Sequence, residues 1–518
     1  MINVEKVKPS GIFTNYIFKA IPLAFDESMS YYEVLAGLLA YLKDTILPAV
    51  NNNADALAEV QNLMTQLQEY VDNYFTNLDV QEEINNKLDE MVEAGTLQEI
   101  IADYLNSKAI FGFDNVQAMK EATNLIDGSY AQTLGYYTKN DGGNGLYKIR
   151  NITNDDIVDN GSIIELSNNE LIAELINKND EINIKQYGAK GDGVTNDYEA
   201  FNKACNKYKN ILIPEGTYLL NQTVNLLNNT NIYGKTAIRC WSGNTDNSKK
   251  TEILTTNNYA FTCTYGYVNN FENLSFNGKG IDTPSGSKIN KCEFYGDTGV
   301  NNMRVTTINE CSFHQCTTAG IKTLTDSIIT NSYFYNNEIG INMLNSNDNT
   351  VCNNKIEWNN VGIRQETSTF NNIVNNTFDR NTTYGIEQIS GSNNLVSNNR
   401  FERNLTAHIK MNGSLNSYSS NTMYRKNSED DQSGTIVPTN AIEIVSLSNS
   451  IINGNVISAT KMFKQSPEYS SNVIVYENTL NGLNTEIKVP FITFAKLSWA
   501  AKPSTTTNKE ELAIIDKT

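Results

Sequence analysis

From Ile182 onward the chain repeats with a period near 22 residues, and this feature limits the possible folds more than any other. Short β-like runs at such a period, separated by Asn and Gly, predict a solenoid in which each turn stacks on its neighbours. A first register of apolar residues comprises Phe294, Phe313, Phe334, Ile356, Phe378, Phe401, Met423, Val456 and Leu480. A second register, in step with it, comprises Val300, Ile321, Ile341, Ile363, Ile386, Ile409 and Ile442. Both jump by 33 residues across Ser428–Pro438, so one inserted loop explains the irregularity.

A parallel β-helix explains this repeat better than a leucine-rich repeat. The latter needs Leu-rich strands and a helical return, and neither is present. Asparagine recurs at the predicted corners, where stacked amide side chains would satisfy one another between turns. The predicted ladder residues are Asn331, Asn353, Asn375, Asn398 and Asn421. We therefore expect a mainly β chain.

The charge of the chain excludes one class of partner. The 518 residues include 40 Lys+Arg and 58 Asp+Glu, a net charge of −18. Such a chain lacks the basic surface that neutralises phosphates, so we expect no nucleic-acid partner. The longest apolar run, Val34–Leu42, has nine residues. A membrane helix needs about 20. No secretion signal is evident at the amino end, and we expect no membrane insertion.

Cysteine and histidine usage argues against metal chemistry. Seven cysteines at scattered spacings favour reduced core residues over a disulfide framework. Two histidines, His314 and His408, are too few for a His-rich metal centre, and a His-based triad is equally unfavoured. We expect His408 to be a packed turn residue. No cofactor or metal is predicted.

Residues 1–110 form the only clearly helical region. A helix is predicted over Tyr31–Leu47 and is ended by Pro48. From Leu57 to Leu78 apolar residues follow one another in steps of three and four. This is a heptad seam, which a single helix cannot bury alone. We expect a self-associating, partly coiled-coil stalk, with an intramolecular helical hairpin as the alternative.

The rest of the chain divides into three parts. Residues 111–181 read as a small β-rich connector without evident chemistry. It contains a short helix near Val116–Thr123 and a hairpin signal at Asn140–Gly143. The β-helix follows over residues 182–480, and a C-terminal cap is predicted over 481–518.

Two segments resemble the pectate-lyase-like right-handed β-helices, namely Ile184–Asp197 (IKQYGAKGDGVTND) and Ile211–Tyr218 (ILIPEGTY). Ser10–Tyr16 and Ala20–Ser28 resemble the virion-attachment ends of tail spike and appendage proteins from phages of Gram-positive hosts. The resemblance implies an elongated homotrimer on the virion, made in the host cytoplasm. Its amino-terminal region would attach to phage tail or neck proteins. Such proteins bind, and often cleave, a host cell-surface polysaccharide.

The first of these segments also has a physical interpretation. Gly188, Gly191 and Gly193 permit a tight loop, and Asp197 can cap a helix that runs to about Tyr208. That helix would cover the unpaired end of the solenoid. We therefore expect Asp192 and Asp197 to be structural.

A column of polar residues follows the first register one position later. Because side chains alternate along a strand, this column faces solvent or a partner chain. It comprises Tyr295, His314, Tyr335, Glu357, Asp379, Glu402 and Tyr424. Its three carboxylates would lie about 5 Å apart on successive strands, and like charges in such a row are destabilising. A costly arrangement of this kind indicates a candidate functional site.

Glu357, Asp379 and Glu402 are the candidate catalytic residues of a glycosidase. Adjacent carboxylates, about 5–5.5 Å apart, suit a retaining mechanism, whereas Glu357 and Glu402 suit an inverting one at roughly 6.5–9.5 Å. One carboxyl would protonate the leaving oxygen, and the other would act as nucleophile or activate water. The alternative is a solvated acid–base edge without a function.

The next position supplies candidate substrate-binding residues. Trp358, Arg380, Arg403 and Arg425 follow the acidic column, although strand alternation would place them on the opposite side. The arginines partly offset the acidic charge. Trp358 and the flanking Tyr335 and Tyr424 could stack on sugar rings. A second polar column alternates in sign and predicts a structural ladder: Asn342, Arg364, Glu387, Lys410 and Glu443.

Two functions remain open. In the first, the chain is a polysaccharide depolymerase, more readily a glycoside hydrolase than a lyase. In the second, it is a non-catalytic receptor-binding adhesin or structural appendage on the same trimeric β-helix.

Overall fold

The computed structural model describes most of the chain between residues 110 and 480. The described residues are 62, 65, 87, 89–97, 110–167, 169–177, 180–227, 229–235, 237, 250–424, 440–458, 463–465, 473–476 and 478–480. The helix predicted over Tyr31–Leu47, the apolar seam of Leu57–Leu78, the inserted loop Ser428–Pro438 and the cap 481–518 lie outside them. The chain forms two compact units, Met1–Thr236 with Asp246–Leu254, and Ala237–Thr245 with Thr255–Thr518. None of the described helices is long and apolar enough to cross a membrane.

The first unit contains a small β-sheet with strand order β1-β2-β3-β5-β4. Its elements are β1 (Ile110–Phe113), α7 (Val116–Lys120), β2 (Tyr130–Thr133), β3 (Gly145–Asn151), β4 (Ile163–Glu165) and β5 (Leu171–Leu175). Helix α7 agrees with the predicted short helix, and the Asn115 side chain caps it. Strands β2 and β3 form the predicted hairpin. Its loop is longer than a two-residue Asp-Gly turn, and the Asp141 carboxylate accepts backbone N–H groups from four residues of it.

The first unit also holds the first parallel strands of the solenoid. Strands β6, β8 and β11 stack in parallel register. The elements here are β6 (Glu181–Asn183), the 3-10 helix η3 (Ile184–Tyr187), β7 (Asp192–Asn196), α8 (Tyr198–Lys207), β8 (Asn210–Ile213), β9 (Gly216–Leu220), β10 (Val224–Leu226) and β11 (Thr230–Gly234). Helix α8 packs on η3, β8 and β10 with Phe201 and Ala204 fully buried. This placement agrees with the predicted covering helix.

Asp197 has a structural role that differs from the predicted one. It is the N-cap residue of α8, but its side chain makes no capping hydrogen bond. Instead, its buried carboxylate accepts the N–H groups of Lys190 at 2.7 Å and Gly191 at 3.1 Å, and so closes the glycine-rich loop. Asp192 is engaged in the same segment by the N–H groups of Val194 and Thr195.

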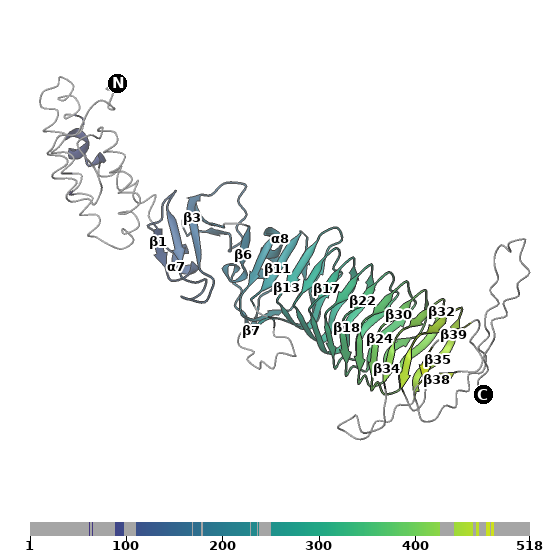
Figure 1. The fold of residues 1–518 in the computed structure, drawn as a ribbon. Helices are drawn as coiled ribbons and strands as arrows, with labels where there is room; N and C mark the ends of the chain where they lie inside the picture. Colours follow the sequence, from purple (N-terminus) through teal and green to yellow (C-terminus); the bar gives the residue numbers. More distant parts are fainter. Residues whose placement is uncertain are drawn as a thin grey trace, which may run out of the picture. The chain divides into compact units, whose positions relative to one another are not determined.

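The second unit is a parallel β-solenoid in which each turn contributes strands to three faces (Figure 1). The first-face strands are β20 (Tyr333–Tyr335), β23 (Lys355–Glu357), β27 (Thr377–Asp379), β31 (Arg400–Glu402), β34 (Thr422–Tyr424), β37 (Val456–Ser458) and β40 (Thr479–Leu480). The second-face strands are β21 (Ile339–Leu344), β24 (Val361–Glu366), β28 (Tyr384–Gln388), β32 (Ala407–Ser414), β35 (Asn440–Ser448) and β38 (Phe463–Gln465). Three longer strands serve both faces: β14 (Ser275–Asp282), β16 (Glu293–Arg304) and β18 (Ser312–Thr325).

The third face is a separate sheet. Its strands in this unit are β13 (Asn269–Glu272), β15 (Lys288–Asn290), β17 (Thr307–Asn309), β19 (Ile328–Thr330), β22 (Thr350–Cys352), β26 (Asn372–Val374), β30 (Leu395–Ser397), β33 (Ser417–Ser419), β36 (Ile451–Asn453) and β39 (Ile474–Tyr476). Short strands β25 (Ser368–Thr369) and β29 (Gly391–Ser392) lie between the second and third faces, and β12 (Thr251–Cys263) spans the boundary between the two units.

The predicted registers stack inside the solenoid. Rings of Phe294, Phe313 and Phe334 lie parallel, with centroids 4.7–4.8 Å apart. The second register pairs residue by residue from Val300 to Ile442. One residue of the first register was wrong. Met423 pairs with Ile457, which is buried, whereas Val456 is exposed. The inserted loop shifted the count by one residue.

Asparagine ladders are present, but one residue later than predicted. In one ladder, Asn354 donates both its backbone N–H and its Nδ2 to Oδ1 of Asn376, at 2.9 and 3.0 Å. Asn376 repeats these contacts to Asn399. The predicted Asn353, Asn375 and Asn398 are left-handed turn residues with φ of 55–58°. Of the five predicted residues, Asn421 alone belongs to the ladder. The prediction was one residue off because the left-handed turn position directly precedes the ladder position, and Asn is favoured at both.

The described cysteines agree with the prediction of reduced residues. All six are free, and five of them are buried, while Cys352 on the third face is half-buried. His408 is fully buried, as predicted, but it lies in strand β32 and not in a turn. Its Nδ1 contacts Nδ2 of Asn404 at 3.0 Å.

Candidate functional site

The acidic column stacks on the first face as predicted. Tyr335, Glu357, Asp379, Glu402 and Tyr424 occupy equivalent positions on β20, β23, β27, β31 and β34. The inward residue before each of them is buried, which sets the outward direction of the column. Each of these strands has three residues, so the chain begins to turn directly after the column.

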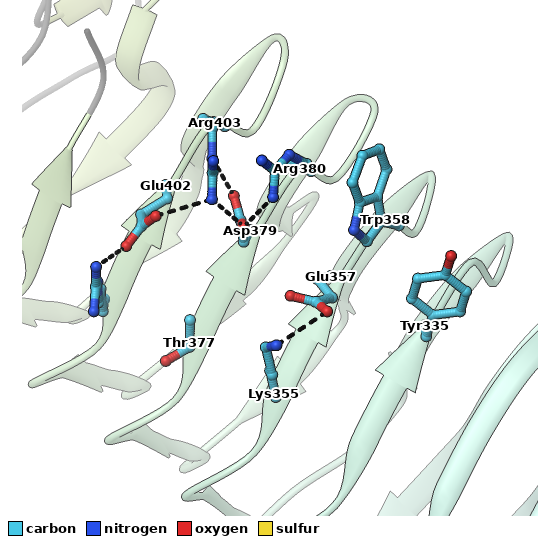
Figure 2. A pocket seen from close by; sticks show the side chains of 10 residues that line it. Tyr335, Lys355, Glu357, Trp358, Thr377, Asp379, Arg380, Glu402 and Arg403 are labelled. Carbon is cyan, nitrogen blue, oxygen red and sulfur yellow. Dashed lines mark hydrogen bonds and ion pairs between the residues drawn. The ribbon is translucent and has the colours of Figure 1, made fainter. Parts of the chain in front are cut away.

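That turn places the next residues differently from the prediction. Trp358, Arg380 and Arg403 have φ of 61°, 53° and 46°, which is the left-handed region. Strand alternation therefore ends at the acidic residue, and the three side chains return to the outward side of the same face (Figure 2). Arg425, the next residue of that column, lies outside the described residues.

The side chains of both columns line an open groove of about 470 Å³. Seven of the eight predicted site residues line this groove. They come from four successive turns, those of β20, β23, β27 and β31. Tyr424 does not line it, although it stacks next to Glu402. The lining residues are Tyr335, Lys355, Glu357, Trp358, Thr377, Asp379, Arg380, Arg400, Glu402 and Arg403.

Three lining residues were missed by the sequence interpretation. Lys355, Thr377 and Arg400 each lie two positions before an acidic residue of the column. Because side chains on a strand repeat every second residue, positions two apart share a face. That rule was sufficient to find them.

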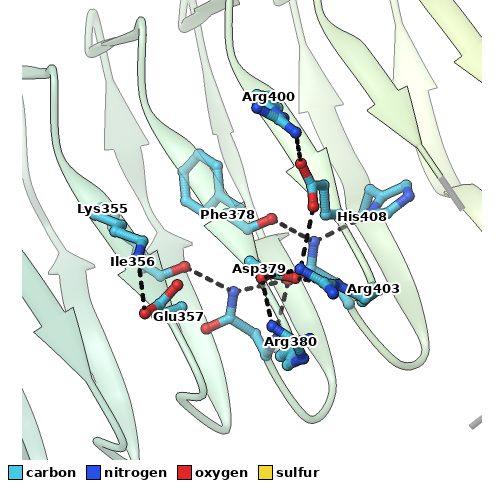
Figure 3. Close-up of polar contacts among 12 residues, drawn as sticks. Lys355, Ile356, Glu357, Phe378, Asp379, Arg380, Arg400, Arg403 and His408 are labelled. Atoms are coloured by element: carbon cyan, nitrogen blue, oxygen red, sulfur yellow. Dashed lines mark hydrogen bonds and ion pairs between the residues drawn. The ribbon is translucent and has the colours of Figure 1, made fainter. Parts of the chain in front are cut away.

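All three carboxylates are paired with cations, and Glu357 and Asp379 are buried, whereas Glu402 is half-buried. Asp379 is 6% exposed, and its Oδ2 lies 3.0 Å from Nη1 of Arg380 and 2.6 Å from Nη2 of Arg403. Glu402 contacts Nη2 of Arg403 at 3.1 Å and also pairs with Arg400. Figure 3 shows this network around Asp379.

Glu357 is the most separate of the three carboxylates. It is 4% exposed, lies 3.2 Å from Nζ of Lys355, and accepts the hydroxyl hydrogen of Tyr333. No arginine pairs with it among the described contacts. Glu357 and Glu402 therefore stand on either side of the Asp379–arginine cluster.

These contacts correct the expectation of an acidic row whose charge the arginines offset only in part. Four cations, Lys355, Arg380, Arg400 and Arg403, face three carboxylates in the groove, so its net formal charge is 4 − 3 = +1. The row therefore does not carry the repulsion expected of like charges on adjacent strands. The local charge of the groove is opposite in sign to that of the whole chain.

The solvent-facing part of the groove is cationic and aromatic. Trp358 is 43% exposed, and the Arg380 guanidinium lies 4.9 Å from its ring centroid, which is a cation–π distance. The side chains of Lys355 and Arg400 are 46% and 67% exposed. A ligand would therefore meet an indole face and several N–H donors before it reached the carboxylates.

An asparagine ladder fixes the turn that carries the groove residues. Asn359, Asn381 and Asn404 directly follow Trp358, Arg380 and Arg403. Asn381 is fully buried and donates Nδ2 to the carbonyl of Ile356 at 3.1 Å and to Oδ1 of Asn404 at 2.7 Å. Its Oδ1 accepts the backbone N–H of Asn359. The ladder thus holds three successive turns at one geometry.

The second polar column, which lies on the second face, is a structural ladder, as predicted. Glu387 pairs with Arg364 at 2.8 Å on the preceding turn and with Lys410 at 3.0 Å on the following one. Lys410 and Glu443 occupy adjacent positions. Among the described residues, no group of three or more His, Cys, Asp or Glu side chains could hold a metal ion.

Comparisons with known proteins show similarity to one family and to several phage proteins. Residues 181–387 match the family described as rhamnogalacturonase A/epimerase, pectate lyase-like. Over that segment the β-solenoid of this chain is similar to the pectate-lyase-like proteins.

Two relatives of known sequence are phage proteins. The chain is 42% identical over 53 residues to the preneck appendage protein of Bacillus phage PZA and to the pre-neck appendage protein of Bacillus phage phi29. Each match spans 10% of this chain and 6% of the relative.

Solved structures share the fold at low sequence identity. The enzymatically active domain of tailspike protein 2 from bacteriophage CBA120 aligns with a TM-score of 0.52 at 17% identity, over 66% of this chain and 57% of that one. The gp42 tailspike of Acinetobacter phage vb_AbaP_AS12 aligns with a TM-score of 0.53 at 11% identity, over 77% of this chain and 79% of that one. These similarities concern the fold.

Proposed function

We propose that this chain is a phage tail spike or neck appendage that binds a polysaccharide of the host cell surface. The groove on the first face is the proposed binding site. The observation that carries the proposal is the exposed Trp358 indole, which contacts the Arg380 guanidinium in a groove that also contains the three carboxylates. Sugar rings present apolar faces that stack on such aromatic side chains and hydroxyl groups that accept from the surrounding N–H donors. The similarity to preneck appendage proteins supports a place on the virion.

The proposed assembly follows the four parts defined above. Residues 1–110 attach the protein to the phage tail or neck and associate into a homotrimer, residues 111–181 connect, residues 182–480 form the β-helix, and residues 481–518 cap it. The protein is made in the host cytoplasm and acts on the virion.

We further propose that the groove depolymerises the bound glycan by inverting hydrolysis. Glu357 and Glu402 are two strands apart, so their backbones are separated by roughly 9.6 Å, close to the upper limit for an inverting pair. Glu357 donates its proton to the glycosidic oxygen as the bond to the anomeric carbon breaks. Glu402 takes a proton from the water whose oxygen bonds to that carbon. Asp379 holds Arg380 and Arg403 in position and does not react.

A non-catalytic adhesin is the second candidate, and one observation favours it. All three carboxylates already accept hydrogen bonds from cations or from Tyr333. Such pairing occupies the oxygens that general acid–base catalysis requires. In this case the groove binds the glycan reversibly through Trp358 and the exposed cations.

Oligosaccharide release from host cell-surface polysaccharide separates the candidates. Mass spectrometry would compare the wild type with Glu357→Gln, Asp379→Asn and Glu402→Gln. We expect release by the wild type and its loss in the two Glu variants, with binding retained. Unsaturated products would identify a lyase, and binding without release would identify an adhesin. For binding, Trp358→Ala should weaken affinity at least tenfold, whereas Tyr424→Ala, outside the groove, should not. Equal effects of these two changes would remove the groove as the binding site.

A further inference from the structure

Seven successive strands of the third face, from β17 to β36, differ from the other two faces in that their outward side chains carry no charge. The preceding strands of this face, β13 and β15, carry Glu272 and Lys288. From β17 to β36 each strand has a buried central residue, and the residues on either side point outward. Over these seven turns the outward residues are Thr, Asn, Ile, Cys, Val, Leu and Ser only. Examples are Ile328, Thr350, Cys352, Val374, Leu395 and Ile451.

The contrast with the other faces is strong in a chain of net charge −18. The first face carries the ionic groove, and the second face carries the ladder of Arg364, Glu387 and Lys410. A parallel sheet is normally covered on both sides. The centre of a protein–protein interface is characteristically depleted of charged residues. The third face therefore has the composition of a covered surface.

The corner beside the third face adds exposed apolar residues in an unfavourable backbone conformation. Val305, Phe370 and Leu415 have φ of 48°, 56° and 56°, and each is 55% exposed. Equivalent corners on other turns use Asp326 and Asp348, which tolerate this conformation better. Exposed apolar side chains at strained positions do not help one chain to fold. Their burial by a partner would stabilise the complex.

We propose that copies of this chain pack on one another through the third face and its Val305–Leu415 corner. Copies that each carry −18 repel, and an uncharged surface is where they can approach most closely. A partner of opposite charge would find no charge on the strands β17 to β36, and only Asp326 and Asp348 at the corner. A glycan would find no aromatic ring among the outward strand residues from β17 to β36, and a single ring, that of Phe370, at the corner.

The size of the surface explains why the corner is included. Seven strands at about 4.8 Å spacing and about 10 Å width give roughly 340 Å², below the ~800 Å² per partner of a standard interface. The apolar corner residues extend the surface. The proposal rests on the homotrimer proposed above and specifies which face forms it. It leaves the first-face groove open and contained within one chain.

Cys352 provides a direct test in the full-length protein. Its half-buried thiol lies on the third face, and the other five described cysteines are buried. N-ethylmaleimide labelling of the native protein, followed by peptide mass spectrometry, gives the rate at Cys352. The reference is the thiol introduced by Leu344→Cys on the second face. We expect Cys352 to react at least tenfold more slowly than the reference. Ile328→Lys combined with Thr350→Lys should remove this protection, whereas Leu344→Lys, beside Glu366 on the second face, should not.

The mass from light scattering distinguishes the outcomes. A trimeric mass with protected Cys352 supports the proposal. A trimeric mass with Cys352 as reactive as the reference keeps the homotrimer and overturns this face as its interface. A monomeric mass overturns both, while the glycan-release assay still judges the groove independently. Circular dichroism checks that the lysine variant is folded. If it is not, the comparison of the two thiols in otherwise native protein decides.

Discussion

The guanidinium of Arg403 holds the carboxylate of Asp379 on the preceding turn through two nitrogens, with Nε 2.9 Å from Oδ1 and Nη2 2.6 Å from Oδ2. Fork-to-fork pairs of this kind fix geometry as well as charge. Since Arg380 contacts the same carboxylate, Asp379 connects both arginines of the groove. The acidic residue at the centre of the column is therefore an organiser of the groove floor.

Replacing Asp379 by Asn should destabilise the solenoid. The change leaves Arg380 and Arg403 without their shared anion, and loss of one partner from a largely buried pair costs about 2–4 kcal/mol here, since the arginines are partly solvated. Denaturant unfolding measures the loss. Asp155→Asn, at an exposed residue of the first unit, is the control and should change the free energy of unfolding by less than about 0.5 kcal/mol. Equal stability of the two variants would contradict the organising role.

Substitutions of two buried asparagines distinguish an effect on stability from an effect on the geometry of the groove. Asn381 and Asn371 make the same set of ladder contacts on different corners, and both are fully buried. Alanine at either position leaves a buried N–H of the preceding turn unsatisfied, which costs about 2 kcal/mol or more. Only Asn381→Ala should also weaken glycan binding, because Asn381 holds the turn between Trp358 and Arg403. Isothermal titration of both variants checks this, and equal binding losses would refute it.

Gln365→Met should stabilise the protein. Gln365 is fully buried on β24, and neither amide atom has a hydrogen-bond partner. The equivalent residue of the preceding turn is Met343, so a thioether fits this position of the stack. Removing an unsatisfied buried amide should raise the free energy of unfolding by about 1 kcal/mol. A lower denaturant midpoint would instead indicate that the amide is satisfied in solution, for example by an internal water.

Acid should weaken the first unit through Asp159. Burial opposes ionisation of this carboxyl, but the N–H groups of Gly161 and Ile163 and the Ser162 hydroxyl, together with Lys207, outweigh it and lower its pKa to about 2. Because the folded pKa lies below the unfolded value of about 3.9, this stabilisation is present above about pH 4. It is lost as the pH falls from about 4 to about 2.

The Asp159→Asn variant tests this dependence. At pH 7 it should be less stable than the wild type by on the order of 2 kcal/mol, and the difference should shrink between pH 4 and pH 2. Thermal unfolding at several pH values measures it. Asp155→Asn, an exposed neighbour, is the matched control. A difference that does not change with pH would exclude Asp159 as the source.

Much of the fold could be predicted because a solenoid repeats. The spacing of Phe294, Phe313 and Phe334 determines which residues stack, and stacking requires no knowledge of distant contacts. Errors appeared where the repeat is interrupted or where two adjacent positions favour the same residue. Val456 was chosen instead of Ile457 after the inserted loop, and Asn375 instead of Asn376 at a corner.

The sequence by itself determined the parallel β-solenoid and the column of Glu357, Asp379 and Glu402, because these depend on periodicity. Only the tertiary structure decided what surrounds that column. The left-handed conformation of Arg380 and Arg403 returns their side chains to the acidic face, and Lys355 and Arg400 approach from two residues earlier. The sequence does not show that an arginine at the end of a strand is left-handed, because this conformation is unfavourable for residues other than glycine. Its energetic cost is offset by the stacked turns and the asparagine ladder, which are contacts of the tertiary structure.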